Sequence, residues 1–159
     1  MLAAKAVEAS SASAGSDGLI HGLTAQEVRL LTKESLDARS LAYCPYSKFH
    51  VGATLLTRDG NFISGANVEN ASYPVGTCAE RVAMSSAIMK GYRMGSFKAV
   101  GVATNLEEPC SPCGMCRQFL REFCELSTPV FLHDKHGQYI VRTLGELLPM
   151  SFGPEHLAA

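Results

Sequence analysis

The sequence has no tryptophan and no excess of basic residues. Lysine and arginine together number 14 against 15 aspartate and glutamate residues, so the formal net charge is −1. Proteins that bind polynucleotides need a positive surface and usually aromatic side chains on which bases stack. We therefore expect no nucleic acid polymer as a partner.

Long apolar runs are missing from the first 22 residues, which are rich in alanine, serine and glycine. Neither the apolar core of a signal peptide nor a membrane span fits this composition. We expect residues 1–22 to be a disordered tail and residues 23–159 to form one catalytic domain, since 159 residues suit a single core. The protein is expected to be cytoplasmic, with no membrane partner.

Three of the six cysteines have the spacing of metal ligands. Cys113 and Cys116 are separated by two residues, and Cys78 stands two residues before Glu80. This spacing favours metal ligation in a reducing compartment over disulfides. Three thiolates can hold Zn²⁺ and leave a fourth position for water, and Glu80 is placed to move the protons of that water. The pattern predicts a hydrolase.

The cysteine-rich loop allows a second register, in which Cys110 pairs with Cys113. We favour Cys113 and Cys116 because Ser111 can then cap the following helix and Pro112 falls in its first turn, where proline is tolerated. The alternative is a closed site in which Cys110 adds a fourth sulfur. Such a site is structural, because it leaves no room for a reactive water.

Arg81 is a candidate for charge compensation at the metal. Zn²⁺ with three thiolates carries a formal charge of −1, which weakens its effect on a bound water. Arg81 follows Cys78 by three residues, so both lie on one helical face, and its guanidinium can donate hydrogen bonds to sulfur. The simpler interpretation is an exposed helix arginine.

The periodicity of the sequence predicts alternating helices and strands. An Asp59-Gly60 turn indicates a hairpin, and two capping boxes begin at Thr24 and Thr143. The expected helices are 24–43, 78–90, one starting near 112, and a short one ending at Pro149; the expected strands are 49–57, 62–67, 99–104, 129–133 and 139–143. We expect an α/β fold, a three-layer α/β/α sandwich around a mixed sheet of about five strands.

Several longer segments resemble a known family, the small homotetrameric cytidine deaminases. The resemblance covers about residues 23–157. It rests on Cys44-Pro-Tyr-Ser-Lys-Phe49-His-Val-Gly-Ala53, Gly65-Ala-Asn67-Val-Glu69-Asn-Ala-Ser-Tyr73-Pro, Thr77-Cys-Ala-Glu-Arg81, Ser111-Pro-Cys-Gly-Met-Cys-Arg-Gln118 and Glu146-Leu-Leu-Pro-Met-Ser-Phe152-Gly-Pro.

The resemblance implies hydrolysis of cytidine and 2′-deoxycytidine to uridine and 2′-deoxyuridine, with release of ammonia, in pyrimidine salvage. It implies that Cys78, Cys113 and Cys116 bind zinc and that Glu80 is the proton shuttle.

The resemblance also implies the substrate contacts. Asn67 and Glu69 would hold the ribose hydroxyls, Phe49 would stack near the base, and the Ala79 backbone N–H would meet the pyrimidine carbonyl. Asn67 and Glu69 stand two positions apart at the end of an expected strand, so their side chains should point the same way.

In the family, a tyrosine and a phenylalanine reach active sites across subunit boundaries. The resemblance therefore implies a homotetramer in which Tyr73 and Phe152 are shared residues. An alternative substrate is a modified cytosine nucleoside such as blasticidin S, although the Asn67 and Glu69 pair favours an unmodified ribose.

Overall fold

The computed structural model describes residues 18–157. Within this range one mixed sheet has the strand order β2-β1-β3-β4-β5, with β3 and β4 parallel and the other neighbours antiparallel. The strands are β1 (Val51–Thr57), β2 (Phe62–Ala66), β3 (Phe97–Thr104), β4 (Pro129–His133) and β5 (Tyr139–Thr143). The predicted mixed sheet of about five strands is confirmed.

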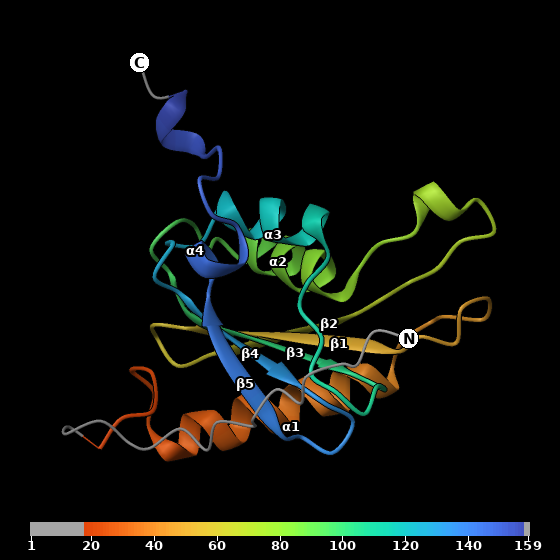
Figure 1. Ribbon diagram of the computed structural model, residues 1–159. Helices are drawn as coiled ribbons and strands as arrows, with labels where there is room; N and C mark the ends of the chain where they lie inside the picture. Colours follow the sequence, from red (N-terminus) through yellow and green to blue (C-terminus); the bar gives the residue numbers. More distant parts are fainter. Residues whose placement is uncertain (1–17, 158–159) are drawn as a thin grey trace, which may run out of the picture.

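Helices cover both faces of this sheet (Figure 1). The long helix α1 lies on one face, and α2 and α3 lie side by side on the other. The helices are α1 (Ala25–Ser40), α2 (Ala79–Met89), α3 (Gly114–Arg121), α4 (Leu144–Leu147) and the 3₁₀ turns η1 (Tyr73–Val75) and η2 (Pro154–His156). The predicted three-layer α/β/α sandwich is confirmed.

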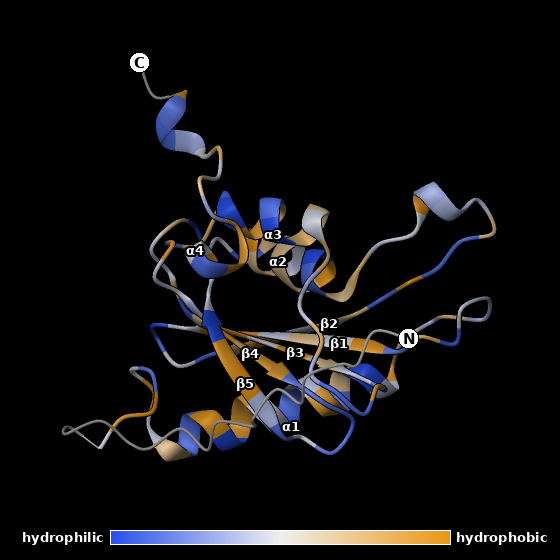
Figure 2. Ribbon diagram, viewed as in Figure 1, coloured by the Kyte–Doolittle hydropathy of each residue, from blue (hydrophilic) through white to orange (hydrophobic). Residues whose placement is uncertain are grey.

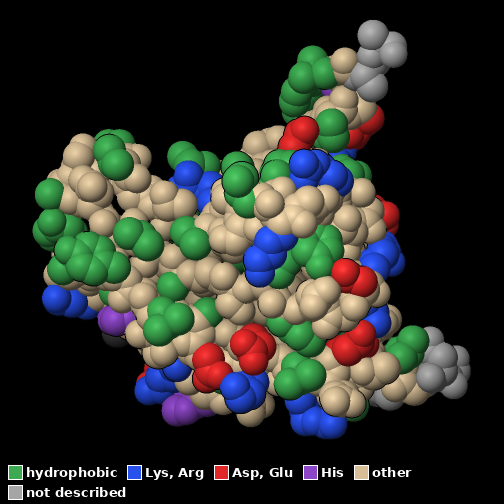
Figure 3. Space-filling model, turned by 180° about the vertical axis from the view of Figure 1, so that it is seen from behind, with side chains coloured by type: hydrophobic (Ala, Val, Ile, Leu, Met, Phe, Trp, Pro, Cys, Tyr) green, Lys and Arg blue, Asp and Glu red, His purple; other side chains and the backbone are tan. Residues whose placement is uncertain are grey.

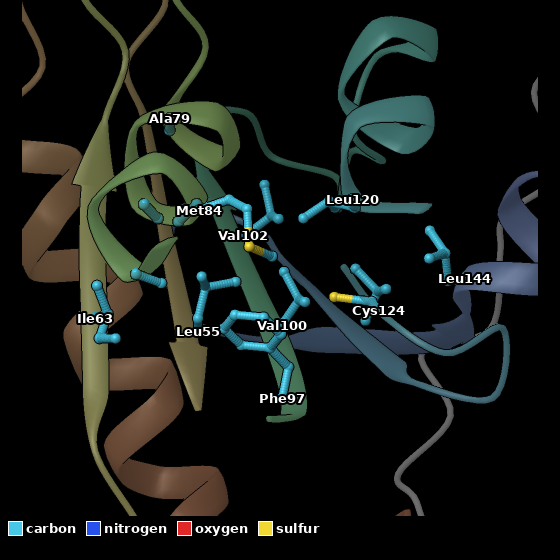
Figure 4. Close-up of a cluster of buried hydrophobic side chains, with 14 of the residues drawn as sticks. Leu55, Ile63, Ala79, Met84, Phe97, Val100, Val102, Leu120, Cys124 and Leu144 are labelled. Atoms are coloured by element: carbon cyan, nitrogen blue, oxygen red, sulfur yellow. The ribbon is translucent and has the colours of Figure 1, made fainter. Parts of the chain in front are cut away.

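A separate apolar core fills each side of the sheet. On the α1 side, Leu31 packs with Leu56 and Phe131. On the α2 and α3 side, the side chains include Met84 and Leu120 (Figure 4). Because the central strands are covered on both faces, β1, β3 and β4 are mostly apolar (Figure 2).

Helix α1 begins as predicted and ends earlier than predicted. Thr24 caps it and exchanges hydrogen bonds with Glu27, which confirms the capping box. The helix stops at Ser40, and Tyr43 is instead extended: its N–H donates to Asn67 O at 2.9 Å and its O accepts from Glu69 N at 2.7 Å. The prediction of helix to residue 43 was wrong because Tyr43 pairs with the chain beyond β2.

The hairpin of β1 and β2 is shorter than predicted at its open end. Strand β1 starts at Val51 rather than residue 49, and β2 ends at Ala66 rather than residue 67. At the closed end Gly60 has a φ of 86°, which confirms the turn expected from the Asp-Gly pair.

Gly65 brings α2 into direct contact with β2. A Cβ at Gly65 would stand 2.5 Å from Ala83 N and 2.8 Å from Ala79 O, both backbone atoms of α2. Only glycine permits this approach. The first turn of α2, which carries Glu80, is thereby fixed against the sheet edge.

The end of the predicted tail contacts the domain. Ile20 pairs with Leu23 and packs against the α1-side core, and the His21 ring meets Phe131 edge-on at 6.1 Å between centroids. Residues 1–17 of the predicted tail lie outside the described residues, and the domain boundary at residue 22 stays a prediction. No helix in the described part of the chain is long and apolar enough to cross a membrane.

Candidate metal centre and active site

Three cysteine sulfurs from two helix starts meet at one point. The Sγ atoms of Cys78, Cys113 and Cys116 all lie within 4.8 Å of one another, and those of Cys78 and Cys113 are 4.0 Å apart. Cys110 is not a member of this group, although it lines the same cavity. Of the two registers open to the sequence, the structure favours the pair Cys113 and Cys116.

Cys78 and Cys113 are the N-cap residues of α2 and α3. Both have extended backbone angles, with ψ of 155° and 163°, and the helices begin one residue later. The expectation that Ser111 would cap α3 with Pro112 in its first turn was wrong. An N-cap side chain points back over the helix end, so both thiols face the positive ends of the helix dipoles.

The thiols of Cys78 and Cys116 shift each other's pKa values in opposite directions. The pKa of Cys78 is lowered to about 5, first by its hydrogen bond with Cys116 and then by Arg81, against the effect of burial. The pKa of Cys116 is raised, first by the same hydrogen bond and then by burial. Because negative charges this close repel, three thiolates can coexist here only around a cation.

Arg81 lies beside the sulfur cluster, as the sequence predicted. Its Nη2 is 3.8 Å from Cys78 Sγ, and its buried Nε has no hydrogen-bond partner within the described residues. The cluster therefore offers three soft sulfur donors with a neighbouring positive charge. These residues fit Zn²⁺, which prefers thiolate ligands and holds a water at the fourth position of catalytic sites.

Glu80 is buried next to the cluster. It lies in the first turn of α2 and its residue is 3% exposed. Burial, and secondarily the charge of Cys78, raise the pKa of its carboxyl. A buried carboxyl beside a metal site is placed to accept and release protons.

A cavity of about 380 Å³ connects the cluster with several predicted substrate residues. Cys78, Glu80, Phe49 and Asn67 all line it. The other lining residues are Val51, Val102, Thr104, Cys110, Ser111, Pro112, Cys113 and Arg117. Residues from five separate parts of the chain therefore meet in one cavity.

Asn67 and Glu69 are both held by the segment that precedes β1. Asn67 accepts from Val51 N and donates to Phe49 O, each at 2.8 Å, whereas Glu69 accepts from Tyr46 N at 2.9 Å and from the Ser47 N–H and hydroxyl. Glu69 lines an adjoining cavity of about 300 Å³ rather than the one with the sulfurs. The structure thus brings Asn67, but not Glu69, into the cavity with Glu80.

The three remaining residues that the resemblance assigns to the substrate lie in three different places. Ala79 is fully buried at the first position of α2, where helix geometry leaves its N–H without an intrahelical acceptor. Tyr73 lines the adjoining cavity, and Phe152 stacks on His156 at 5.1 Å. Tyr73 and Phe152 are 73% and 57% exposed and do not line the sulfur cavity of their own chain.

Sequence reasoning missed several residues that line this cavity, among them Thr104 and Arg117. Thr104 ends β3, and Arg117 stands directly after Cys116. The position of Arg117 next to a ligand was the signal that could have marked it. Strand residues such as Val102 carried no such signal, because an apolar strand residue can face either side of the sheet.

Comparison with known proteins agrees with this geometry. Residues 25–132 match the family model described as the cytidine and deoxycytidylate deaminase zinc-binding region. The cytidine deaminase of Sporosarcina psychrophila is 47% identical over 132 residues, which cover 83% of this chain and 96% of that protein. That of Halalkalibacterium halodurans is 44% identical over 129 residues, covering 81% and 96%.

A solved structure is similar as well. The crystal structure of cytidine deaminase from Burkholderia pseudomallei matches with a TM-score of 0.76 and 44% identity, over 78% of this chain and 98% of that one. The family match spans both the Glu80 segment and the Cys113 segment, which the structure brings to one cavity. The chain therefore belongs to the family of cytidine and deoxycytidylate deaminases that carry this zinc-binding region.

Proposed function

We propose that this chain deaminates cytidine and 2′-deoxycytidine to uridine and 2′-deoxyuridine, with release of ammonia, in pyrimidine salvage. One observation carries the proposal: buried Glu80 shares a cavity with Cys78 and Cys113, two of the three cysteines whose sulfurs cluster. Relatives that are 44–47% identical over most of their length are named cytidine deaminases. The cavity volume of about 380 Å³ suits a ligand of nucleoside size.

The reaction replaces the C4–N bond of cytosine by a C4–O bond to water. Zinc held by the three thiolates would polarise that water and lower its pKa. Glu80 then accepts one proton from the water and delivers it to ring N3, and it later moves the second proton of that water to the amino group, which leaves as ammonia. Burial excludes bulk water from its carboxyl, so the protons stay between Glu80 and the substrate.

Residues around Glu80 are proposed to orient the nucleoside. The Ala79 N–H would bind the pyrimidine carbonyl, Phe49 would pack on the base, and Asn67 would bind a ribose hydroxyl through the hydrogen-bonding capacity left by its two backbone bonds. Glu69, in the adjoining cavity, would reach the other hydroxyl after exchanging one of its contacts with Ser47.

The test is a Glu80→Gln variant assayed with cytidine by ultraviolet absorbance. We expect turnover to fall at least about 1,000-fold, because the amide cannot carry a proton, while zinc content stays at the wild-type value. Glu122→Gln, on the exposed end of α3, is the matched control and should keep wild-type activity. A Glu80→Gln variant with near-wild-type turnover would refute the mechanism.

Substrate choice is tested with a panel of cytidine, 2′-deoxycytidine, cytosine, adenosine and blasticidin S. We expect the two cytidine nucleosides to be converted and the other three to be left unchanged. Conversion of blasticidin S alone would instead support the alternative of a modified nucleoside.

We further propose a cytoplasmic homotetramer with shared active sites. All six cysteines are free thiols, which supports a reducing compartment. The loop carrying Tyr73 and the C-terminal segment carrying Phe152 project from the body (Figure 1), and hydrophobic side chains gather on the projecting parts (Figure 3). Exposed apolar groups on projecting segments are typical of protein interfaces.

A further inference from the structure

Arg117 makes three hydrogen bonds that join separate parts of the chain. Its Nε donates to Pro112 O at 2.7 Å, its Nη2 donates to Ser111 Oγ at 2.6 Å, and its Nη1 donates to Leu147 O at 2.9 Å. The side chain is half-buried and lines the sulfur cavity. The guanidinium therefore contacts both the loop before Cys113 and the end of α4.

Two of these bonds hold the peptide unit that leads into Cys113. Pro112 has no N–H, so no backbone amide at this position can fix the loop to a neighbour. Arg117 compensates by binding the Pro112 carbonyl and the preceding Ser111 hydroxyl. The orientation of the Pro112–Cys113 peptide sets the direction of the Cys113 side chain, and Cys113 is exposed.

The third bond extends this support to the C-terminal segment. Leu147 is the last residue of α4, and the next residue of α3, Gln118, donates to Phe152 O at 2.9 Å. The loop that carries Cys113 and the segment that carries Phe152 are thus attached to neighbouring side chains of one helix.

We propose that Arg117 is a positioning residue that holds Cys113 in place for the metal and links this ligand to the C-terminal segment. Arginine suits this role because its planar guanidinium spreads its donors over three nitrogens and so reaches acceptors on separate segments, whereas the three donors of lysine share one nitrogen. The effect on catalysis rests on the proposed function, whereas the effect on metal retention does not.

The test compares Arg117→Gln with Arg121→Gln. Arg121 lies one turn further along α3 and is more buried, and it bonds Ser151 and Glu155 but no residue of the metal loop. Zinc release from each zinc-loaded protein is followed with a chromogenic chelator. We expect Arg117→Gln to release zinc at least about 10-fold faster than wild type, as is usual for residues that orient metal ligands, and Arg121→Gln to release it at the wild-type rate.

Two milder variants keep the proposal testable if Arg117→Gln does not fold. Arg117→Lys should release zinc at an intermediate rate, and Ser111→Ala, which removes only one of the three bonds, should accelerate release a few-fold. The absorption spectrum of the Co²⁺-substituted protein should change in Arg117→Gln and stay unchanged in Arg121→Gln, because it reports on the ligand geometry.

Equal zinc release from wild type and Arg117→Gln would overturn the inference, as would equal acceleration in both glutamine variants. A raised KM for cytidine with unchanged zinc release would also overturn it, since Arg117 would then act on the substrate. A wild-type protein that holds zinc but leaves cytidine unchanged would instead refute the proposed function and leave the zinc comparison intact.

Discussion

At the scale of single residues, burial decides which ionisable groups do chemistry. Glu80 and Arg81 are consecutive and lie beside the same sulfurs; Glu80 is buried, and Arg81 is half-buried with its Nε out of contact with water. Glu80 can carry protons, while Arg81 offsets the negative charge of the sulfurs. Neither effect would be strong at an exposed helix start, because water would screen both groups.

The cysteine assignment predicts a contrast between two serine variants. Cys116→Ser should lose bound zinc, because a hydroxyl is a poor ligand for Zn²⁺ and Cys116 is fully buried in the cluster. Cys110→Ser should keep one zinc per chain, because Cys110 lies outside the cluster. Metal content of the purified proteins checks both. Loss of zinc from Cys110→Ser would contradict the assignment.

His133 predicts a loss of stability in acid. It is 0% exposed, with Nδ1 3.2 Å from Val102 O and Nε2 3.0 Å from Thr32 Oγ1, and burial first lowers its pKa to about 4. A pKa below the unfolded value of 6.5 means that the folded state binds this proton more weakly. The contribution of His133 to the unfolding free energy is therefore fully present above pH 6.5. It declines by roughly 3 kcal/mol as the pH falls through about 4.

This prediction is tested by measuring the unfolding free energy of His133→Asn and of wild type in urea at several pH values. The variant keeps an amide donor but cannot titrate, so its unfolding free energy should fall less steeply than that of wild type between pH 6.5 and 4. Parallel slopes for wild type and His133→Asn would rule out this contribution.

At the scale of elements, the contact of α2 with β2 sets the position of the metal site. Helix α2 carries Cys78 at its N-cap and Glu80 in its first turn, and Gly65 permits its close approach to the sheet. Helix α3 brings the other two sulfurs to the same point. The site therefore depends on two helix ends held at a fixed separation by the sheet beneath them.

Gly65→Ala should disturb this arrangement. The new Cβ would stand 2.5 Å from Ala83 N, so α2 must move away from β2. We expect the unfolding free energy to fall by about 1–3 kcal/mol and turnover to fall with it, because Cys78 and Glu80 move with the helix. Gly114→Ala, where a Cβ meets nothing within 4 Å, is the control. It should change the unfolding free energy by less than about 0.5 kcal/mol.

At the scale of the whole molecule, the proposed shared sites predict complementation between inactive proteins. Tyr73→Ala removes a residue that we propose enters a neighbouring site, and Glu80→Gln removes the proton carrier within a site. After subunit exchange, a site with an intact Glu80 from one chain can receive Tyr73 from the other. We expect mixtures of the two variants to regain activity that neither has alone.

Size-exclusion chromatography of the mixture, with the same activity assay, checks this prediction. Tyr73→Phe, which keeps the ring, serves as the control for packing and should remain assembled. Full activity of a protein diluted to monomers would contradict the shared sites.

Much of the fold and of the site could be predicted because the relevant signals are local. Capping boxes act between residues three positions apart, and strand alternation and the turn at Gly60 depend on immediate neighbours. The sequence signal for the chemistry of the site was also local. It consists of two cysteines three positions apart and a glutamate two positions after a third cysteine, a pattern typical of a metal site with a proton carrier.

By itself, the sequence determined which residue types could hold zinc and move protons, and where most helices and strands lie. Only the tertiary structure decided that Cys78 meets Cys113 and Cys116 rather than Cys110, that Tyr43 leaves α1 to pair beyond β2, and that Arg117 supports the metal loop. The physical reason is the distance along the chain over which each kind of interaction acts. Propensities and caps act within a turn or two of the chain, whereas contacts between distant segments depend on how the sheet and its two helix layers pack together.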